Sequence, residues 1–110
     1  MSKEVLGELE HQVLLAVLRC GGEAYSVPLV LELERRTGRE VAPAAVYIAL
    51  RRLEEKGLAE STMRTPGEDE GGRSRRYFQV TEDGLAQLRE SKRRFVSLWE
   101  GLDPVLEEGT

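Results

Sequence analysis

The stretch that decides the fold lies at residues 43–58 and reads PAAVYIALRRLEEKGL. Pro43 fits the first turn of a helix, where the missing backbone N–H is not needed for a hydrogen bond. Apolar residues then recur at the three-four spacing of one helix face, made of Val46, Ala49, Leu50 and Leu53. Gly57 follows where a helix usually receives its C-terminal cap. The stretch therefore predicts a short helix that buries one face in a protein core.

The opposite face of this predicted helix is unusual for a surface helix. It carries Ala44, Tyr47, Ile48 and Arg51, whereas a solvent-facing stripe normally consists of charged and polar residues. Because short and apolar side chains gain little from contact with water, we expect another molecule to cover this face.

Two more helices are predicted before this one. Residues 6–20 carry a wide apolar stripe that ends at Gly21-Gly22. Ser26 is expected to cap a second helix, with Pro28 in its first turn and an end at Thr37-Gly38. The inward face of this second helix is supplied by Leu29, Val30 and Leu33. The chain thus opens with three amphipathic helices in succession.

Beyond Gly57 the periodicity changes from that of a helix to that of strands. Residues 58–64 and 73–80 read as two short strands, and residues 65–72 between them are rich in turn-forming Pro and Gly. The order helix, helix, helix, hairpin is that of a winged helix-turn-helix, in which the third helix enters the major groove of DNA. We therefore expect a mainly α fold with a small two-stranded β-hairpin.

A fourth helix is predicted after the hairpin. Thr81 can cap it, Glu82-Asp83 suit its N-terminal dipole, and it should run to about Gly101, before a last turn at Asp103-Pro104. Its apolar residues have the spacing of a helix that pairs with another helix, and two-fold homodimers are the commonest soluble oligomers. The predicted dimer interface, to which the first helix contributes, consists of Leu6, Leu9, Val13, Leu85, Leu88, Lys92, Phe95, Trp99 and Leu102.

The composition fits one small domain without catalytic chemistry. With 110 residues and 40% hydrophobic content, the chain can bury a single modest core. No apolar run approaches the length of a membrane span and no signal peptide is visible, so we expect a cytoplasmic protein without a membrane partner. The single cysteine, Cys20, and the single histidine, His11 on the polar side of the first helix, form neither a nucleophilic nor a metal-binding constellation. No enzyme activity, cofactor or metal is expected.

The charge distribution points to DNA more than the net charge does. The net charge of −4 argues against nucleic acid, but basic residues cluster at 51–52, 73–76 and 92–94. Arginines at the base of the hairpin are expected to meet phosphates or the minor groove, whereas the acidic tip at residues 68–70 should stand clear of them. The residues predicted to contact double-stranded DNA are Ser26, Pro43, Ala44, Ala45, Tyr47, Ile48, Arg51, Arg73, Arg75 and Arg76.

Several of these interpretations have alternatives. Tyr47 could simply pack between helices. Arg51 and Arg52 could pair with acids nearby, namely Glu34, Glu54 or Glu55. Trp99 could be a packing anchor or a stacking surface for a small-molecule effector. Ile48 suits a thymine methyl group or a protein partner equally well, so a winged-helix module that binds protein without binding DNA stays open.

A set of short motifs extends over nearly the whole chain, namely Tyr25-Ser26-Val27-Pro28, Val46-Tyr47, Leu50, residues 52–58, Gly71-Gly72-Arg73, Arg76-Tyr77-Phe78, Val80-Thr81 and Gly84. Together these motifs resemble the PadR family. The resemblance implies a dimeric, mostly repressing transcription regulator of the short subfamily, whose single C-terminal helix makes the dimer and in some members borders an effector pocket.

This resemblance implies a winged helix-turn-helix DNA-binding domain at residues 1–81, followed by a dimerisation helix and tail at residues 82–110. One departure affects the predicted reading of bases. Where relatives often carry Gly followed by Thr or Ser at the start of the third helix, this chain has Ala44-Ala45. The change removes a hydroxyl that could contact phosphate, so a relative's base preference does not transfer to this chain.

Overall fold

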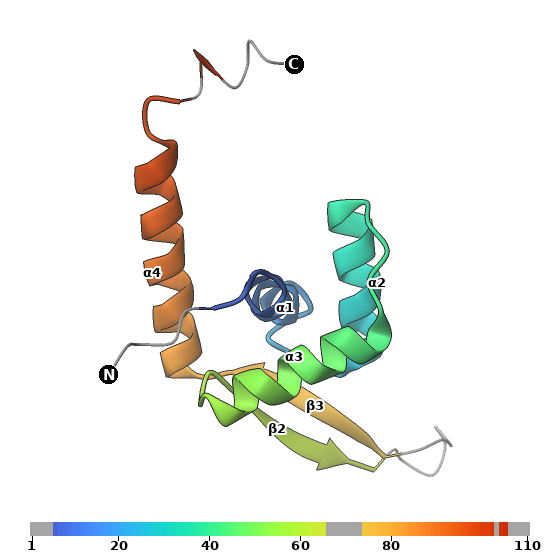
Figure 1. The fold of residues 1–110 in the computed structure, drawn as a ribbon. Coiled ribbons are helices and arrows are strands. Elements are labelled where there is room, and N and C mark those ends of the chain that lie inside the picture. Colours follow the sequence, from blue (N-terminus) through green and yellow to red (C-terminus); the bar gives the residue numbers. More distant parts are fainter. Residues whose placement is uncertain (1–5, 66–73, 103, 106–110) are drawn as a thin grey trace.

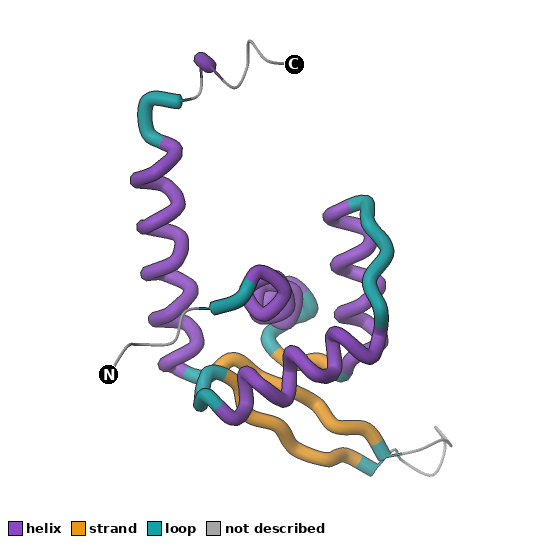
Figure 2. Tube along the Cα trace, in the orientation of Figure 1, coloured by secondary structure: helices purple, strands orange, loops and turns teal. Residues whose placement is uncertain are grey.

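The computed structural model of the protein describes residues 6–65, 74–102, 104 and 105. Within them the elements follow in the order α1 (Glu8–Arg19), β1 (Glu23–Ala24), α2 (Ser26–Thr37), α3 (Pro43–Glu55), β2 (Ala59–Arg64), β3 (Arg75–Val80) and α4 (Glu82–Trp99). Helices predominate and the strands form one small sheet, as predicted (Figure 1 and Figure 2). α4 ends close to the predicted Gly101, and residues 104 and 105 are helical, while Asp103 lies outside the described residues.

The small sheet has three antiparallel strands in the order β1-β3-β2. β2 and β3 form the predicted hairpin, in which Ala59 lies opposite Val80. β1 adds a strand at the other edge of β3, where Ala24 lies opposite Phe78. The predicted two-stranded hairpin is therefore confirmed. The sheet has one strand more than the sequence predicted, because the two residues of β1 are too few to show any alternation.

The helix boundaries follow the residues expected to set them, with one exception. α3 has Pro43 as its first residue, and Gly57 just beyond its end adopts the left-handed φ of 79° that favours glycine. Thr81 Oγ1 accepts a hydrogen bond of 3.0 Å from a backbone N–H in the first turn of α4 and so caps that helix. Ser26 does not cap α2, because the extended residue before this helix is Tyr25 and Ser26 is already its first helical residue.

The hydrophobic core lies where α1, α2, α3 and the sheet meet. In Figure 1, α1 is seen end-on between α4 and α2, with α3 and the sheet below it. The predicted buried stripe of α3 is confirmed, since its four apolar residues are at most 5% exposed. Leu14 of α1 and Phe78 of β3 are fully buried in the same cluster. This packing fixes the orientation of α3 and leaves its opposite face towards solvent.

An ion pair with little exposure ties the end of α3 to α1. Lys56 Nζ donates to Glu10 Oε1 at 2.8 Å, and the Gly7 N–H donates to the same oxygen at 3.2 Å. Burial raises the pKa of Glu10, but these hydrogen bonds and the positive charge of Lys56 outweigh burial, so the net pKa lies below its ordinary value. The charged pair therefore holds the C-terminal end of α3 against α1 at neutral pH.

α4 packs on the rest of the protein mainly through its first half. Near its start a Cβ on Gly84 would lie 2.2 Å from the Leu58 carbonyl oxygen, so glycine alone permits this approach. Leu88 and Ser91 further along the helix are also buried. From Lys92 onwards every described residue is exposed, because the helix extends beyond α1 (Figure 1). The second half of α4 is thus largely exposed, although the Phe95 ring still contacts the His11 ring of α1.

Candidate nucleic-acid interface

The outward face of α3 carries the residues that the sequence places there. Tyr47 is 41% exposed and Ile48 is 52% exposed, on the side of the helix opposite the buried stripe. Pro43 and Ala44 at the start of α3 and Arg51 two turns on are exposed too, whereas Ala45 is half-buried. These residues, which we call the α3 surface, combine short side chains at the start of the helix with a long cation further along.

Tyr47 packs against another element and also stays partly exposed. Its ring meets the Phe78 ring edge-on, with centroids 6.3 Å apart and an interplanar angle of 83°. The same side chain keeps two-fifths of its surface exposed. Packing on Phe78 therefore fixes the ring at the junction of α3 and β3, where it remains accessible to a bound molecule.

The two described arginines of the predicted basic cluster lie on opposite faces of the wing, which we define as strands β2 and β3. Arg76 lies on the same face as Phe78, towards α3, and its Nη1 donates to Ser61 Oγ at 2.9 Å. Arg75 lies on the other face, with its guanidinium carbon 4.6 Å from the centre of the Tyr25 ring. Arg73 and the acidic tip at residues 68–70 lie outside the described residues.

The outer face of the wing is covered by aromatic rings and arginines. The Tyr25 and Tyr77 rings meet edge-on with centroids 5.4 Å apart, and the Arg64 guanidinium lies 4.7 Å from the centre of the Tyr77 ring. Glu23 of β1 pairs with Arg64 and accepts a hydrogen bond of 2.6 Å from Gln79. Because Arg64 has this carboxylate partner, its charge is partly neutralised on the outer face.

The inner face of the wing is joined to α3 by Glu54, which sequence reasoning treated only as a pairing partner. Ser61 Oγ donates to Glu54 Oε2 at 2.6 Å, and Arg51 Nε lies 3.6 Å from Glu54 Oε1. The alternative in which Arg51 pairs with a nearby acid is thus confirmed for Glu54. Glu34 instead accepts a hydrogen bond of 3.0 Å from the Val41 N–H.

Two residues of this inner face were missed by the sequence analysis. Ser61 and Met63 lie on the side of β2 that faces α3, and Met63 is exposed. The alternation of side chains along β2 could have identified them, given that Phe78 points into the core and lies opposite Ser61. Ser26, by contrast, is half-buried at the start of α2 and does not belong to the α3 surface.

A second surface, on α4 and α1, carries exposed apolar residues. The α4 face that contributes Gly84, Leu88 and Ser91 to the protein interior continues along the helix as an exposed stripe. Among its members, Phe95 is 53% exposed and Trp99 is 52% exposed. We call this set the α4 stripe; it consists of Phe95, Leu98 and Trp99 of α4 and of Leu102 just beyond the end of the helix.

The part that α1 was predicted to contribute to the dimer interface is partly wrong. Val13 is fully buried in the core, and Leu6 and Leu9 are half-buried against it. The apolar residues that α1 exposes are Leu15 and Leu18. Because residues 13–18 are all apolar, two faces of this helix fit a three-four spacing, and the sequence could not tell which one is inward.

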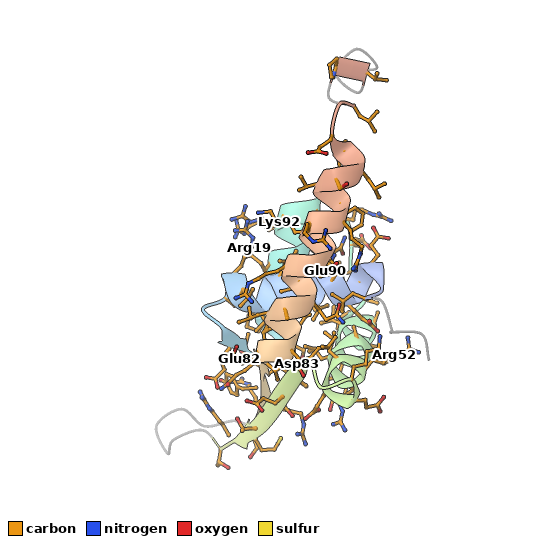
Figure 3. The ribbon with its side chains drawn as sticks, turned by 90° about the vertical axis from the view of Figure 1, so that its left-hand side faces the viewer. Arg19, Arg52, Glu82, Asp83, Glu90 and Lys92 are labelled. Atoms are coloured by element: carbon orange, nitrogen blue, oxygen red, sulfur yellow. The ribbon has the colours of Figure 1, made fainter. Side chains whose placement is uncertain are left out.

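In α4 too, some of the predicted interface residues are buried in the protomer and others are exposed. Leu88 belongs to the protomer core and has almost no surface left for a partner, so its assignment to the interface is wrong. Leu85 is half-buried and Lys92 is exposed. Figure 3 shows Lys92 and Glu90 on α4, above Glu82 and Asp83 at its start.

The third basic cluster, at residues 92–94, is balanced by an acid on the same helix. Arg93 pairs with Glu90, and Arg94 Nη1 lies 3.3 Å from the same carboxylate. The hydrogen bond from Arg93 is the main cause of a pKa of Glu90 below its ordinary value. The cluster therefore belongs to the surface of α4 and not to the face formed by α3 and the wing.

His11 lies against α4 and not on a polar face. Its ring stacks on the Phe95 ring, with centroids 6.1 Å apart and an interplanar angle of 29°. The residue is half-buried, and burial lowers the pKa of its imidazole. The sequence analysis placed His11 on the polar side of α1, but this side is partly covered because α4 packs across it.

Neither a metal site nor a membrane span is found in the part of the chain that the structure describes. Across residues 6–65, 74–102, 104 and 105, no three His, Cys, Asp or Glu side chains are grouped so that they could hold a metal ion. Over the same residues, no helix combines the length and the apolar character needed to cross a bilayer.

Comparisons with known proteins agree with this geometry. A PadR family transcriptional regulator from Eggerthella lenta DSM 2243 is 30% identical, with a TM-score of 0.68 over 86% of this chain and 80% of that one. A PadR-like transcriptional regulator from Bacillus cereus strain ATCC 14579 is 26% identical, with a TM-score of 0.71 over 89% of this chain and 90% of that one.

A more distant likeness concerns the fold alone. F93 from STIV, a winged-helix DNA-binding protein, is 14% identical, with a TM-score of 0.65 over 83% of this chain and 90% of that one. Among curated proteins, none matches the chain in sequence.

Residues 14–90, well over half of the chain, match the transcriptional regulator PadR-like family. The chain therefore belongs to the PadR-like family of transcriptional regulators and has a winged-helix DNA-binding fold.

Proposed function

We propose that this regulator binds double-stranded DNA as a homodimer and represses transcription by occupying a promoter. The observation that carries the proposal is the outward face of α3, where Tyr47, Ile48 and Arg51 lie exposed beside the inner face of the wing. A winged helix places such a face in the major groove and its hairpin along the phosphate backbone.

Each residue of the α3 surface has a role that its chemistry permits. Ala44 and the half-buried Ala45 let the helix approach the groove closely, and Ile48 can contact a thymine methyl group. Tyr47 offers a hydroxyl to phosphate or base, and Arg51 offers a guanidinium one turn later. These side chains would read the base sequence.

Other residues would hold the backbone of the DNA in place. Arg76 on the inner face of the wing is best placed for phosphates next to the groove that α3 enters. Arg73, Arg75 and Ser26 are proposed as further phosphate contacts, and Pro43 as an apolar contact at the start of α3. Such contacts add affinity and salt dependence without choosing a sequence.

The homodimer is supported by the α4 stripe. A protomer that exposes Phe95 and Trp99 on one continuous helix face leaves apolar surface in water that a second α4 would cover. Leu15 and Leu18 of α1, with the partly exposed Leu6, Leu9, Leu85 and Lys92, would extend the contact. Two-fold pairing would set two α3 helices about 34 Å apart on one face of the DNA.

An effector is proposed to act at the same place. Trp99 lies on the α4 stripe with half its surface exposed, so an aromatic small molecule could stack on it where two protomers meet. A ligand that favours one spacing of the two α3 helices would change the affinity for DNA. Saturable quenching of Trp99 fluorescence by such a ligand, with a parallel change in DNA affinity, is expected.

These roles divide the chain into two parts. Residues 1–81 are proposed to bind DNA, and residues 82–110 to form the dimer. The packing of Gly84 and Leu88 against the first unit would transmit a change in α4 pairing to α3. Since members of this family are transcription regulators, we propose a cytoplasmic site of action and no enzyme activity.

The test is fluorescence anisotropy with the upstream DNA of the protein's own gene and a scrambled duplex, at rising salt. We expect tighter binding to the upstream DNA, and Arg51→Ala is expected to weaken it by about tenfold. Arg89→Ala on α4 is the matched control and should leave binding unchanged. Equal binding of both duplexes would contradict a promoter-bound autoregulator. Absence of any binding at low salt would favour a winged helix that contacts protein.

A further inference from the structure

Glu54 lies between two arginines of the surface assigned to DNA. Its Oε2 accepts a hydrogen bond from Ser61 Oγ at 2.6 Å, and Ser61 Oγ in turn accepts one from Arg76 Nη1 at 2.9 Å. Its other oxygen, Oε1, lies 3.6 Å from Arg51 Nε. One carboxylate therefore connects α3 to the wing and faces Arg51 directly, while it reaches Arg76 only through a neutral hydroxyl.

The two oxygens of Glu54 differ in what compensates their negative charge. Oε2 has a short hydrogen bond, whereas Oε1 is buried and has no hydrogen-bond partner within the described residues. A buried carboxylate oxygen without a donor is costly unless a cation lies near it. The Arg51 guanidinium is the cation that the geometry supplies, because it stands within ion-pair distance on the same helix.

DNA phosphates would have to compete with this carboxylate. A guanidinium that binds a phosphate loses part of its interaction with Glu54, and Oε1 loses its compensating charge. A phosphate that binds Arg51 replaces one anion by another at the guanidinium, whereas a matching guanine edge adds hydrogen bonds that unrelated sequences do not offer. The carboxylate therefore opposes contacts with any DNA more than contacts with a matching sequence.

We propose that Glu54 is an intramolecular counter-ion that competes with DNA phosphates for Arg51 and thereby weakens binding to DNA of unrelated sequence. This inference rests on the proposed function, since it requires α3 to face DNA. It makes Glu54 a positioning residue that acts through Arg51, without contacting DNA itself.

The test compares Glu54→Gln with Glu55→Gln on a scrambled duplex, by anisotropy at several salt concentrations. Glutamine keeps an oxygen for Ser61 to donate to and removes the charge. Glu55 is an exposed neighbour on the same helix, so its variant carries the same change in net charge. We expect E54Q to bind about fivefold more tightly than E55Q, with a salt slope steeper by about one, because Arg51 becomes available to a phosphate.

A double-mutant cycle separates this role from a structural one. In an Arg51→Gln background E54Q should no longer increase the affinity for DNA. An increase caused by a general structural change in the wing would persist in that background. If E54Q does not fold, Glu54→Asp, which withdraws the carboxylate from Arg51, should show a smaller gain of the same sign.

Failure of the inference about Glu54 and failure of the proposed function would give different results. If the wild-type protein binds DNA and Arg51→Gln weakens that binding, but E54Q binds no more tightly than E55Q, this inference is overturned and the proposed function stands. If the wild-type protein binds no DNA at low salt, or Arg51→Gln leaves binding unchanged, the role of the α3 surface fails and this inference fails with it.

Discussion

Arg75 and Arg76 are neighbours in the sequence but point to opposite faces of β3. Arg76 donates to Ser61 on the side that faces α3, whereas the Arg75 guanidinium lies over the Tyr25 ring on the outer side. The two charges that the sequence groups together therefore cannot act on the same phosphate. The wing divides them between a face that adjoins the α3 surface and a face that is turned away from it.

This division predicts unequal effects of the two arginines on DNA binding. Arg76→Ala should weaken binding to any duplex by about tenfold at low salt and reduce the salt slope by about one, because one phosphate contact is lost. Arg75→Ala, which makes the same change on the other face of the strand, serves as the matched control and should have a smaller effect. A larger loss for Arg75→Ala would mean that DNA lies along the outer face of the wing.

The dimer is predicted to depend on the exposed part of α4. Replacement of Phe95 and Trp99 by Asp should give a folded monomer, because charge on this stripe cannot be buried against a second copy. Ala86→Asp adds one negative charge at an exposed position on another side of α4 and should leave the dimer intact. Sedimentation velocity and circular dichroism would report assembly and folding separately. A double variant that still sediments as a dimer would show that α4 is not the interface.

The stability of the protein is predicted to fall as the pH drops below the ordinary His11 pKa. Burial against Phe95 lowers the pKa of His11 from its ordinary value of 6.5, so the unfolded chain binds a proton more readily than the folded one. Stability therefore rises with pH through this window and is lost as the imidazole is protonated. His11→Gln should lose less melting temperature than wild type between about pH 7.5 and about pH 5.5. Equal losses of melting temperature in the two proteins would mean that the His11 side chain is exposed to water in the folded protein.

The close approach of α4 to the sheet is predicted to tolerate only glycine. A Cβ at residue 84 would lie 2.2 Å from the Leu58 carbonyl oxygen and 2.8 Å from Val80 Cγ1. Gly84→Ala should therefore lower the free energy of unfolding by about 2 kcal/mol or more. At Gly7 the nearest atoms to a Cβ are 3.8 Å away, so Gly7→Ala should cost about 1 kcal/mol or less. Urea denaturation of both variants measures the difference, and similar values would refute the close contact.

The sequence predicted the elements whose residues carry a long periodic signal. The α3 stripe and its outward face, the hairpin, and the cap at Thr81 are all found in the structure. Each of them depends on neighbours a few residues apart, which a pattern can show. The winged-helix order followed from these elements alone.

The failures concern contacts between distant residues. β1 exists because it pairs with β3, and His11 is covered because α4 crosses α1. The inward face of α1 is chosen by the core, since both of its faces are apolar. Glu54 acquires its position from Ser61, seven residues away on β2. Such relationships arise from tertiary packing, which local periodicity does not contain.

The central claim is that DNA binds to the outward face of α3 and the inner face of the wing, and amide correlation spectra recorded during titration with a duplex test it most directly. We expect the largest shift changes at residues 43–55 and around Ser61 and Arg76, with the stripe from Phe95 to Leu102 little affected. Changes confined to α4, or spread evenly over the surface, would contradict the account.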